Sequence, residues 1–274
     1  MKNYIFALGT LSVVVLFIII KFGFWSVNEV SIDKLQVTEG VTYLRKTLRS
    51  GNNIVHIDLF KVDTSKAAIG ITNPKVVGSI DARRYDAYSI EEYATRGPYV
   101  VVQSGGFLSS WSPPSALGYV KVKGIEYNPV HDSWLTNGVF CTNCRKFEIK
   151  KFTSSESFSG WTSCLQAGPL IAEGGKIVLN TARHTWYVTG EKHRQSFMCK
   201  ASDGRLIMGL AEDVSLADFS RSLIASEEDG GIGCIDAVLL TSKGIAGIYS
   251  SNPDIPQVGS VDVPLPNAIV VHAP

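Results

Sequence analysis

The sequence predicts an α+β domain in which many short strands form a strand-rich mixed sheet around a few helices. Short runs rich in β-branched and aromatic residues recur along the chain between clusters of Gly, Asn, Ser and Asp. Helix signals occur in only two places, and they do not alternate with strands as in a βαβ fold. We assign this domain to residues 39–274, after an apolar segment at 1–25 and a membrane-proximal segment at 26–38.

The N-terminal segment predicts a transmembrane helix. Residues 4–20 carry no charge, and the apolar run continues past Lys21 to Trp25. A helix needs about 20 residues to cross a bilayer, and Lys21 can extend its charge to the surface. A cleaved signal peptide is the alternative, although Phe24 and Trp25 disfavour a cleavage site. With Lys2 at the start, we expect a single-pass protein with a cytoplasmic N-terminus and a periplasmic or extracellular body.

The rest of the chain is nearly neutral. The protein has 26 Lys and Arg against 25 Asp and Glu, and residues 1–25 hold two of the lysines and no acid. The 45% hydrophobic content excludes a disordered chain. Without an excess of positive charge, nucleic acid is not an expected partner.

Strands are expected in order along this body. A hairpin joins residues 41–48 and 54–62 across the turn cluster at 50–53. Residues 99–103 form a continuous apolar run, which is typical of a strand buried on both faces. Further strands are expected at 118–122, 138–141, 147–152, 170–172, 176–179, 195–200, 205–211, 237–240 and 268–272.

Two helices complete the predicted fold. Ser89 and Glu92 are spaced as a capping box, in which each side chain accepts a hydrogen bond from the other residue's backbone. Ser215 is placed to cap a second helix, whose apolar residues Leu216, Phe219 and Leu223 recur at helical spacing.

Two loops at strand ends carry groups suited to a ligand. Ser104, Gly105 and Gly106 follow the buried strand, and their backbone N–H groups could bind an anion; an ordinary tight turn is the alternative. Gln166 precedes a turn at Gly168, and its amide could bind a sugar hydroxyl, although turn chemistry explains the glycine equally well.

Arg194 and Trp111 are further candidates. Arg194 precedes an apolar strand and suits bidentate phosphate recognition, whereas many such arginines are simply solvated. Trp111, Trp134, Trp161 and Trp186 lie in polar contexts, where a tryptophan either stacks on a sugar ring or covers the edge of a core. We favour stacking for Trp111, because it follows the glycine loop closely.

The five cysteines do not form a metal motif. Cys141 and Cys144 supply two ligands where structural zinc needs four, so we expect no metal and no cofactor. In an oxidising compartment a disulfide would either join these two or link one of them to Cys164. Because five is odd, at least one thiol should stay free or pair between chains.

Several motifs together resemble the phosphodiester glycosidase family. They are, in order, Glu39 to Tyr43, Val55 to Asp58, Val102 to Phe107, Ala116 to Gly118, Asn137 to Phe140, Gln166 to Leu170, Arg194, Asp203 to Arg205, and Asp236 to Leu240. The resemblance implies hydrolysis of a sugar-1-phosphodiester, of N-acetylglucosamine type or in an envelope glycan. It also implies that Arg194 holds the phosphate and that Glu212, with Asp213 beside it, is the acid/base group.

The sequence departs from the family pattern at two places. Ser104 replaces an asparagine before the two glycines, and Thr241, a third catalytic candidate by position, replaces an aspartate near the C-terminus. A hydroxyl cannot replace a carboxylate as a base without an activating neighbour. Enzyme activity is therefore left open, and the alternatives are a catalytically weakened glycan or phosphoglycan binder and a structural envelope protein.

Overall fold

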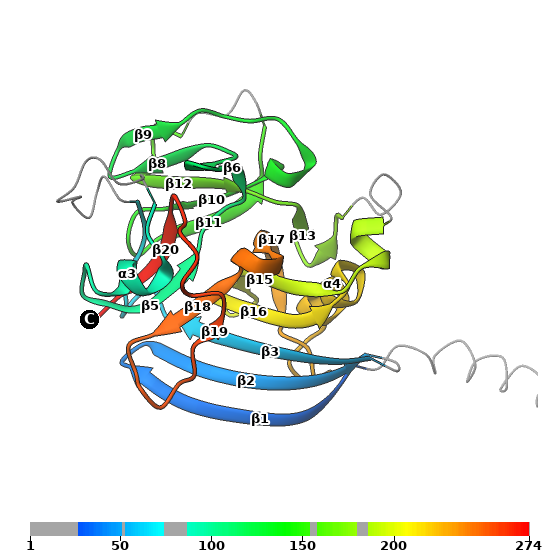
Figure 1. Ribbon diagram of the computed structural model, residues 1–274. Coiled ribbons are helices and arrows are strands. Elements are labelled where there is room, and N and C mark those ends of the chain that lie inside the picture. Colours follow the sequence, from blue (N-terminus) through cyan, green and yellow to red (C-terminus); the bar gives the residue numbers. More distant parts are fainter. Residues whose placement is uncertain (1–26, 51–52, 74–86, 154–157, 180–185, 274) are drawn as a thin grey trace, which may run out of the picture.

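The structure, a computed structural model, describes residues 27–50, 53–73, 87–153, 158–179 and 186–273. Within these ranges strands dominate, and the two α-helices are short, α3 (Ile90–Ala94) and α4 (Leu216–Ile224) (Figure 1). The α+β prediction is confirmed. The expectation of a mixed sheet is wrong, because the strand pairings in the described residues are all antiparallel. Short turns join many consecutive strands, and such turns produce antiparallel pairs.

The largest sheet has eight strands in the order β1-β2-β3-β16-β15-β17-β13-β14. Their bounds are β1 (Val27–Thr38), β2 (Val41–Ser50), β3 (Asn53–Val62), β13 (Leu170–Glu173), β14 (Lys176–Ile177), β15 (His193–Ala201), β16 (Leu206–Val214) and β17 (Cys234–Ser242). The predicted hairpin is present as β2 and β3. β1 pairs with β2, so the sheet extends into the segment that we had left outside the domain.

Two five-stranded sheets and a hairpin complete the fold. The second sheet has the order β11-β10-β12-β8-β9, the third has the order β19-β18-β5-β20-β4, and β6 pairs with β7. The bounds in the second sheet are β8 (Val120–Val122), β9 (Ile125–Asn128), β10 (Gly138–Thr142), β11 (Phe147–Lys151) and β12 (Ser163–Ala167). The other bounds are β4 (Ile69–Thr72), β5 (Tyr99–Ser104), β6 (Leu108–Trp111), β7 (Pro114–Ala116), β18 (Gly247–Ser250), β19 (Val258–Gly259) and β20 (Ala268–His272).

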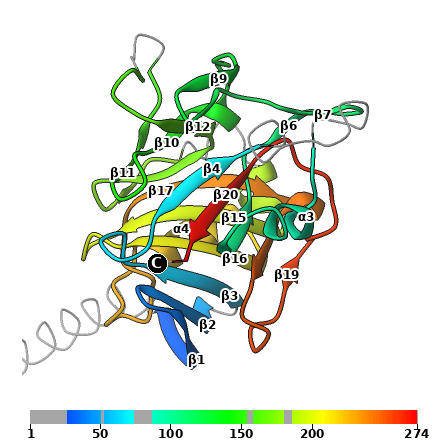
Figure 2. The same ribbon diagram turned by 90° about the vertical axis from the view of Figure 1, so that its left-hand side faces the viewer.

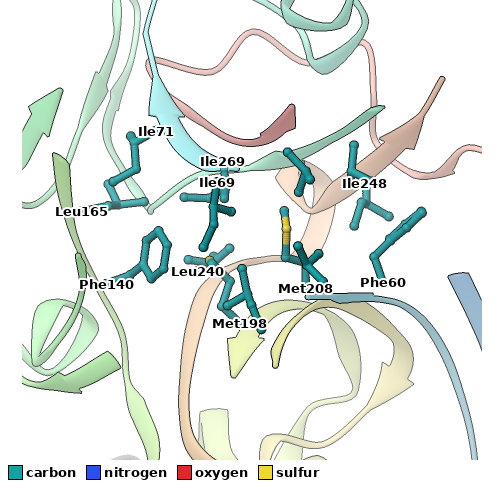
Figure 3. Close-up of a cluster of buried hydrophobic side chains, with 14 of the residues drawn as sticks. Phe60, Ile69, Ile71, Phe140, Leu165, Met198, Met208, Leu240, Ile248 and Ile269 are labelled. Carbon is teal, nitrogen blue, oxygen red and sulfur yellow. The ribbon is translucent and has the colours of Figure 1, made fainter. Parts of the chain in front are cut away.

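The main hydrophobic core lies where the three large sheets meet. Figure 2 shows strands of the second sheet at the top of the molecule and β1 to β3 at the bottom. Phe60 and Met208 come from the first sheet, Phe140 from the second, and Ile248 and Ile269 from the third, and their side chains converge in Figure 3. Because alternate residues of a strand face one side, each sheet contributes every second side chain to this core.

Each helix covers an outer sheet face, as its sequence pattern predicts. On α4, Phe219 stacks edge-on against Phe197 of β15, with ring centroids 4.9 Å apart. Ser215 caps this helix, and the capping box of Ser89 and Glu92 is present on α3. These contacts fix the strand ends on which the candidate site is built.

Two disulfides each join adjacent strands within one sheet. Cys141 of β10 bonds to Cys164 of β12, which is one of the pairings that the sequence left open. Cys199 of β15 bonds to Cys234 of β17, a pairing that the sequence analysis did not foresee. Cys144 is free and exposed, as the odd count requires.

The predicted transmembrane helix at residues 1–25 lies outside the described residues. In the part of the chain that the structure describes, no helix is long and apolar enough to cross a membrane.

Candidate functional site

Arg194 and Glu212 form an ion pair on neighbouring strands of the largest sheet. Arg194 Nε donates to Glu212 Oε1 at 2.7 Å, and the two side chains are 28% and 33% exposed. They lie near one end of the β15–β16 ladder, where a register shift falls between His193 and Gln195. The pair is therefore partly desolvated yet open to a ligand, the setting in which charge-assisted hydrogen bonds are strong.

A glycine segment lies directly against this arginine. Arg194 Nη1 is 3.4 Å from Ser260 Oγ, and a Cβ atom added to Gly259 would come within 3.1 Å of Arg194 Cδ. Gly259 also has a φ of +80°, which an L side chain rarely adopts. A glycine is needed here because a Cβ would also lie only 2.3 Å from the backbone carbonyl oxygen of Ala246.

Ser104 connects to the same region from the third sheet. Its hydroxyl accepts from the backbone N–H of Gly247 at 3.3 Å and donates to Ser196 Oγ at 3.1 Å. Gly247 pairs with Gly259, which lies against Arg194, and Ser196 is two residues from Arg194 along β15. The structure thus brings Ser104, Arg194 and Glu212 into one neighbourhood.

Thr241 lies beside this neighbourhood but inside the protein. It faces Ser196 across the β15–β17 ladder and is fully buried. Its hydroxyl has no hydrogen-bond partner in the described residues, and the same holds for both side-chain polar atoms of buried Gln195. A buried polar atom normally has a partner, so the unpaired atoms of Thr241 and Gln195, which lie on opposite faces of the sheet, are each suited to ordered water.

The glycine loop is partly occupied by another side chain. The backbone N–H of Gly106 donates to Asn267 Oδ1 at 3.1 Å, and a Cβ on Gly105 would lie only 1.8 Å from that oxygen. The loop therefore holds Asn267, and the Gly106 amide is not free to bind an anion as the sequence interpretation expected. Asn267 is 1% exposed, and its Nδ2 has no partner among the described residues.

Gln166 and Gly168 both have structural roles inside the protein. Gln166 Oε1 accepts from the backbone of Tyr119 and His131, while its Nε2 donates to the carbonyls of His131 and Thr136. These bonds use all its hydrogen-bonding capacity, so no group remains for a sugar hydroxyl. A Cβ on Gly168 would meet the backbone of Leu135 at 2.9 Å. We therefore leave both residues out of the proposed site.

A second cluster of charges adjoins the arginine along the chain. Glu191 accepts from His193 Nε2 at 2.5 Å and from Lys243 Nζ at 3.3 Å. These hydrogen bonds hold the pKa of the Glu191 carboxyl below its usual value. Within the described ranges, no group of three or more His, Cys, Asp or Glu side chains could hold a metal ion.

Sequence reasoning missed Ser196, Asn267 and Ser260. Each is a common polar residue without a motif of its own, and each contacts a candidate from a strand or loop distant in sequence. The one available signal was a polar residue next to a short apolar run, as Ser196 lies before Phe197, Met198 and Cys199 in β15.

The fold is shared with solved structures of low sequence identity. A hypothetical protein from Synechocystis has a TM-score of 0.67 and 11% identity, over 88% of this chain and 64% of that one, so this chain spans less than two thirds of it. A second similar structure is the catalytic domain of zebrafish N-acetylglucosamine-1-phosphodiester α-N-acetylglucosaminidase, auto-inhibited by its pro-peptide. It has a TM-score of 0.61 and 13% identity, and the match covers 92% of this chain and 84% of that one.

A third similar structure, from Burkholderia pseudomallei, is named as a candidate exported protein. Its TM-score is 0.59 and its identity 8%, over 90% of this chain and 97% of that one. No protein-family model matches the sequence, and no curated protein matches it significantly. At these identities the likeness shows a common fold.

Proposed function

We propose that the chain is a membrane-anchored, extracytoplasmic phosphodiester glycosidase that hydrolyses a sugar-1-phosphodiester, of N-acetylglucosamine type or within an envelope glycan. The observation that carries the proposal is the partly exposed ion pair of Arg194 and Glu212. The similarity of the fold to the zebrafish catalytic domain supports the reaction class.

In this proposal Arg194 receives the phosphate and Glu212 activates water. Water attacks the anomeric carbon and gives its proton to the Glu212 carboxylate, while the bond between the carbon and the phosphate oxygen breaks. The phosphate leaves with the bonding electrons, and the guanidinium stabilises its charge. Because a phosphate monoester has a second pKa of about 6, it leaves without help from a strong acid. One carboxylate can then serve where an ordinary glycoside would require two.

The two disulfides support a location outside the cytoplasm, because structural disulfides persist in oxidising compartments. We propose that residues 1–25 anchor the protein in the membrane as a single helix, with the N-terminus in the cytoplasm and the body in the periplasm or outside the cell. The length and apolarity of residues 4–25 support this anchor.

A second candidate function is binding of a glycan or phosphoglycan without hydrolysis. The burial of Thr241, at the position where the resemblance leads us to expect an aspartate, favours it. Ser104 likewise uses its hydroxyl in hydrogen bonds to Ser196 and Gly247. The site would then keep Arg194 for phosphate and lack a second acidic group.

The deciding experiment uses the full chain in detergent with a methyl diester of N-acetylglucosamine 1-phosphate, and measures release of the free sugar. We expect turnover, a decrease in kcat of about 10² to 10⁴ for Glu212→Gln, and a higher KM for Arg194→Ala. Arg205→Ala is the matched control, because Arg205 forms an exposed ion pair with Asp203 in the turn of the β15–β16 hairpin, at the opposite end from Arg194 and Glu212.

The other outcomes separate the candidates. Binding that requires Arg194 but produces no turnover would support the second function. An absence of both binding and turnover would contradict both candidates and leave the structural envelope protein.

A further inference from the structure

Two pockets adjoin the β6–β7 hairpin, and neither is lined by Arg194 or Glu212. The Asn267 pocket has a volume of about 180 Å³, and its lining includes Pro113, Pro114, Tyr127, Asn128, Pro266 and Asn267. The Trp111 pocket has a volume of about 370 Å³, and its lining includes Tyr88, Glu92, Trp111, Ser112, Pro114 and Pro264. Pro114 lines both, so the pockets are adjacent.

The walls of both pockets combine flat apolar groups with a few polar ones. Trp111 is 64% exposed, the largest exposed fraction among the big hydrophobic side chains that the structure describes. An exposed aromatic face matches the apolar C–H face of a pyranose, while amide and carboxylate groups suit its hydroxyls. Proline and aromatic walls with Glu92, Asn128 and Asn267 at the polar positions therefore fit a sugar ring.

Asn267 gives an independent indication of a ligand. Its Oδ1 is held by the backbone N–H of Gly106, while its Nδ2 is buried and has no partner in the described residues. Leaving such a donor unpaired has a cost in stability, because a buried donor has lost its bond to water. An acceptor bound in the Asn267 pocket would remove this cost. At about 180 Å³ the pocket is smaller than the usual site for a drug-sized ligand, which is about 300 to 1,000 Å³, and it suits a single ring.

One chain segment connects these pockets to the Arg194–Glu212 pair. Ser260 contacts Arg194, Pro264 lines the Trp111 pocket, and Asn267 lines the other pocket. Seven residues of chain reach at most about 25 Å when extended, so the three features lie within reach of one oligosaccharide.

We propose that the two pockets form one glycan-binding groove, which holds the sugars of the substrate that extend away from the reacting phosphodiester. This inference rests on the proposed function and specifies its substrate. The ligand is a glycosyl phosphate that carries a neutral oligosaccharide of hexose or N-acetylhexosamine units, and not an isolated sugar phosphate. Trp111 stacks on one ring, and Asn267 Nδ2 donates to an oxygen of another.

The test uses the full chain in detergent on an array of neutral hexose and N-acetylhexosamine oligosaccharides, followed by calorimetry with the best ligand and its monosaccharide. We expect the oligosaccharide to bind more tightly than the monosaccharide. Trp111→Ala should weaken oligosaccharide binding about tenfold, the loss expected for one aromatic stacking contact. Because Trp111 is mostly exposed, this variant should keep its fold.

The control is Ile125→Ala, since Ile125 on β9 is 58% exposed and lines neither pocket. It should bind as the unchanged protein does. Arg194→Ala should also retain binding of the neutral oligosaccharide, even if the proposed hydrolysis fails, so the two proposals can fail separately. The groove is refuted if no array oligosaccharide binds, or if Trp111→Ala binds as tightly as the unchanged protein.

Discussion

The hydroxyl of Thr241 is fully buried, and in the described residues it has no hydrogen-bond partner. If that hydroxyl is unpaired, Thr241→Val should raise the free energy of unfolding by about 1 kcal/mol, because a buried unpaired hydroxyl is costly. Urea denaturation measures the change. Ser196→Ala is the control, and it should lower stability by about 1 kcal/mol, since Ser196 accepts bonds from Gln103 and Ser104.

The same variant tests the role that the resemblance gives to Thr241. If Thr241→Val leaves turnover unchanged, the side chain at this position serves only to pack the protein interior. A loss of stability in Thr241→Val would instead show that the hydroxyl has a partner, such as an ordered water, and would contradict the assignment of an unpaired hydroxyl.

His272 makes the stability of the domain depend on pH. Burial, with a smaller contribution from Lys123, lowers the pKa of this histidine below its usual value. Protons therefore bind more readily to the unfolded chain, and stability should fall as the pH drops below about 6.5 until the lowered pKa is reached. Urea denaturation at pH 8 and pH 5 should show a smaller pH-dependent loss in His272→Gln. An equal loss in both proteins would exclude His272 as a cause.

At the residue scale the sequence was informative where contacts are local. Arg194 and Glu212 lie on β15 and β16, which follow one another in the chain and are joined by a short turn, so their closeness follows from one hairpin. The contact of Asn267 with Gly106 spans 161 residues and depends on the β5–β20 pairing. No local pattern encodes such a pairing, because strand order arises from packing of the whole core.

At the scale of elements, the two disulfides should contribute similar amounts of stability. They join adjacent strands and close loops with sequence separations of 23 and 35 residues. Loop-closure entropy assigns about 3 to 4 kcal/mol to each. We expect replacement of either pair by alanines to lower the free energy of unfolding by about that amount, measured with urea.

Cys144→Ser is the matched control for the disulfides, since this thiol is exposed and free. It should leave stability unchanged. If Cys144→Ser destabilised the domain as much as removing Cys141 and Cys164, the assigned pairing would be wrong.

The elements that the sequence predicted are those with strong periodicity or clear caps. The hairpin of β2 and β3, the buried strand β5 and both capped helices are present as expected. β12 was missed because Ser163, Cys164 and Gln166 give it no apolar alternation, although it is wholly buried. It pairs on both sides, with β10 and β8, and these neighbours stabilise a strand of weak intrinsic preference.

At the scale of the whole molecule, phosphate affinity must come from a few placed groups. The protein has a formal net charge of +1, and part of its positive charge lies on Lys2 and Lys21 in the N-terminal segment. A neutral body has no general positive field to attract an anionic glycan. Binding through Arg194 and the groove near Trp111 would instead combine one charge with apolar stacking, which fits a long, weakly charged ligand.

The whole-molecule prediction concerns the N-terminal segment. If residues 1–25 anchor the protein, the full chain should remain with membranes after washing at high salt and alkaline pH. A chain beginning at residue 26 should be released, because the remaining body has nearly balanced charge. Roughly 20 apolar residues give an anchor that such washing does not extract. Membrane fractionation of cells expressing each form measures this.

N-terminal sequencing of the mature protein separates the anchor from a cleaved signal peptide. A mature chain that begins at Met1 or Lys2 supports the anchor, whereas one that begins near Ser26 shows cleavage. In either case the disulfides should be formed, since both routes deliver the body to an oxidising compartment. Reduced cysteines in the cellular protein would place the body in the cytoplasm and contradict both the anchor orientation and the proposed envelope substrate.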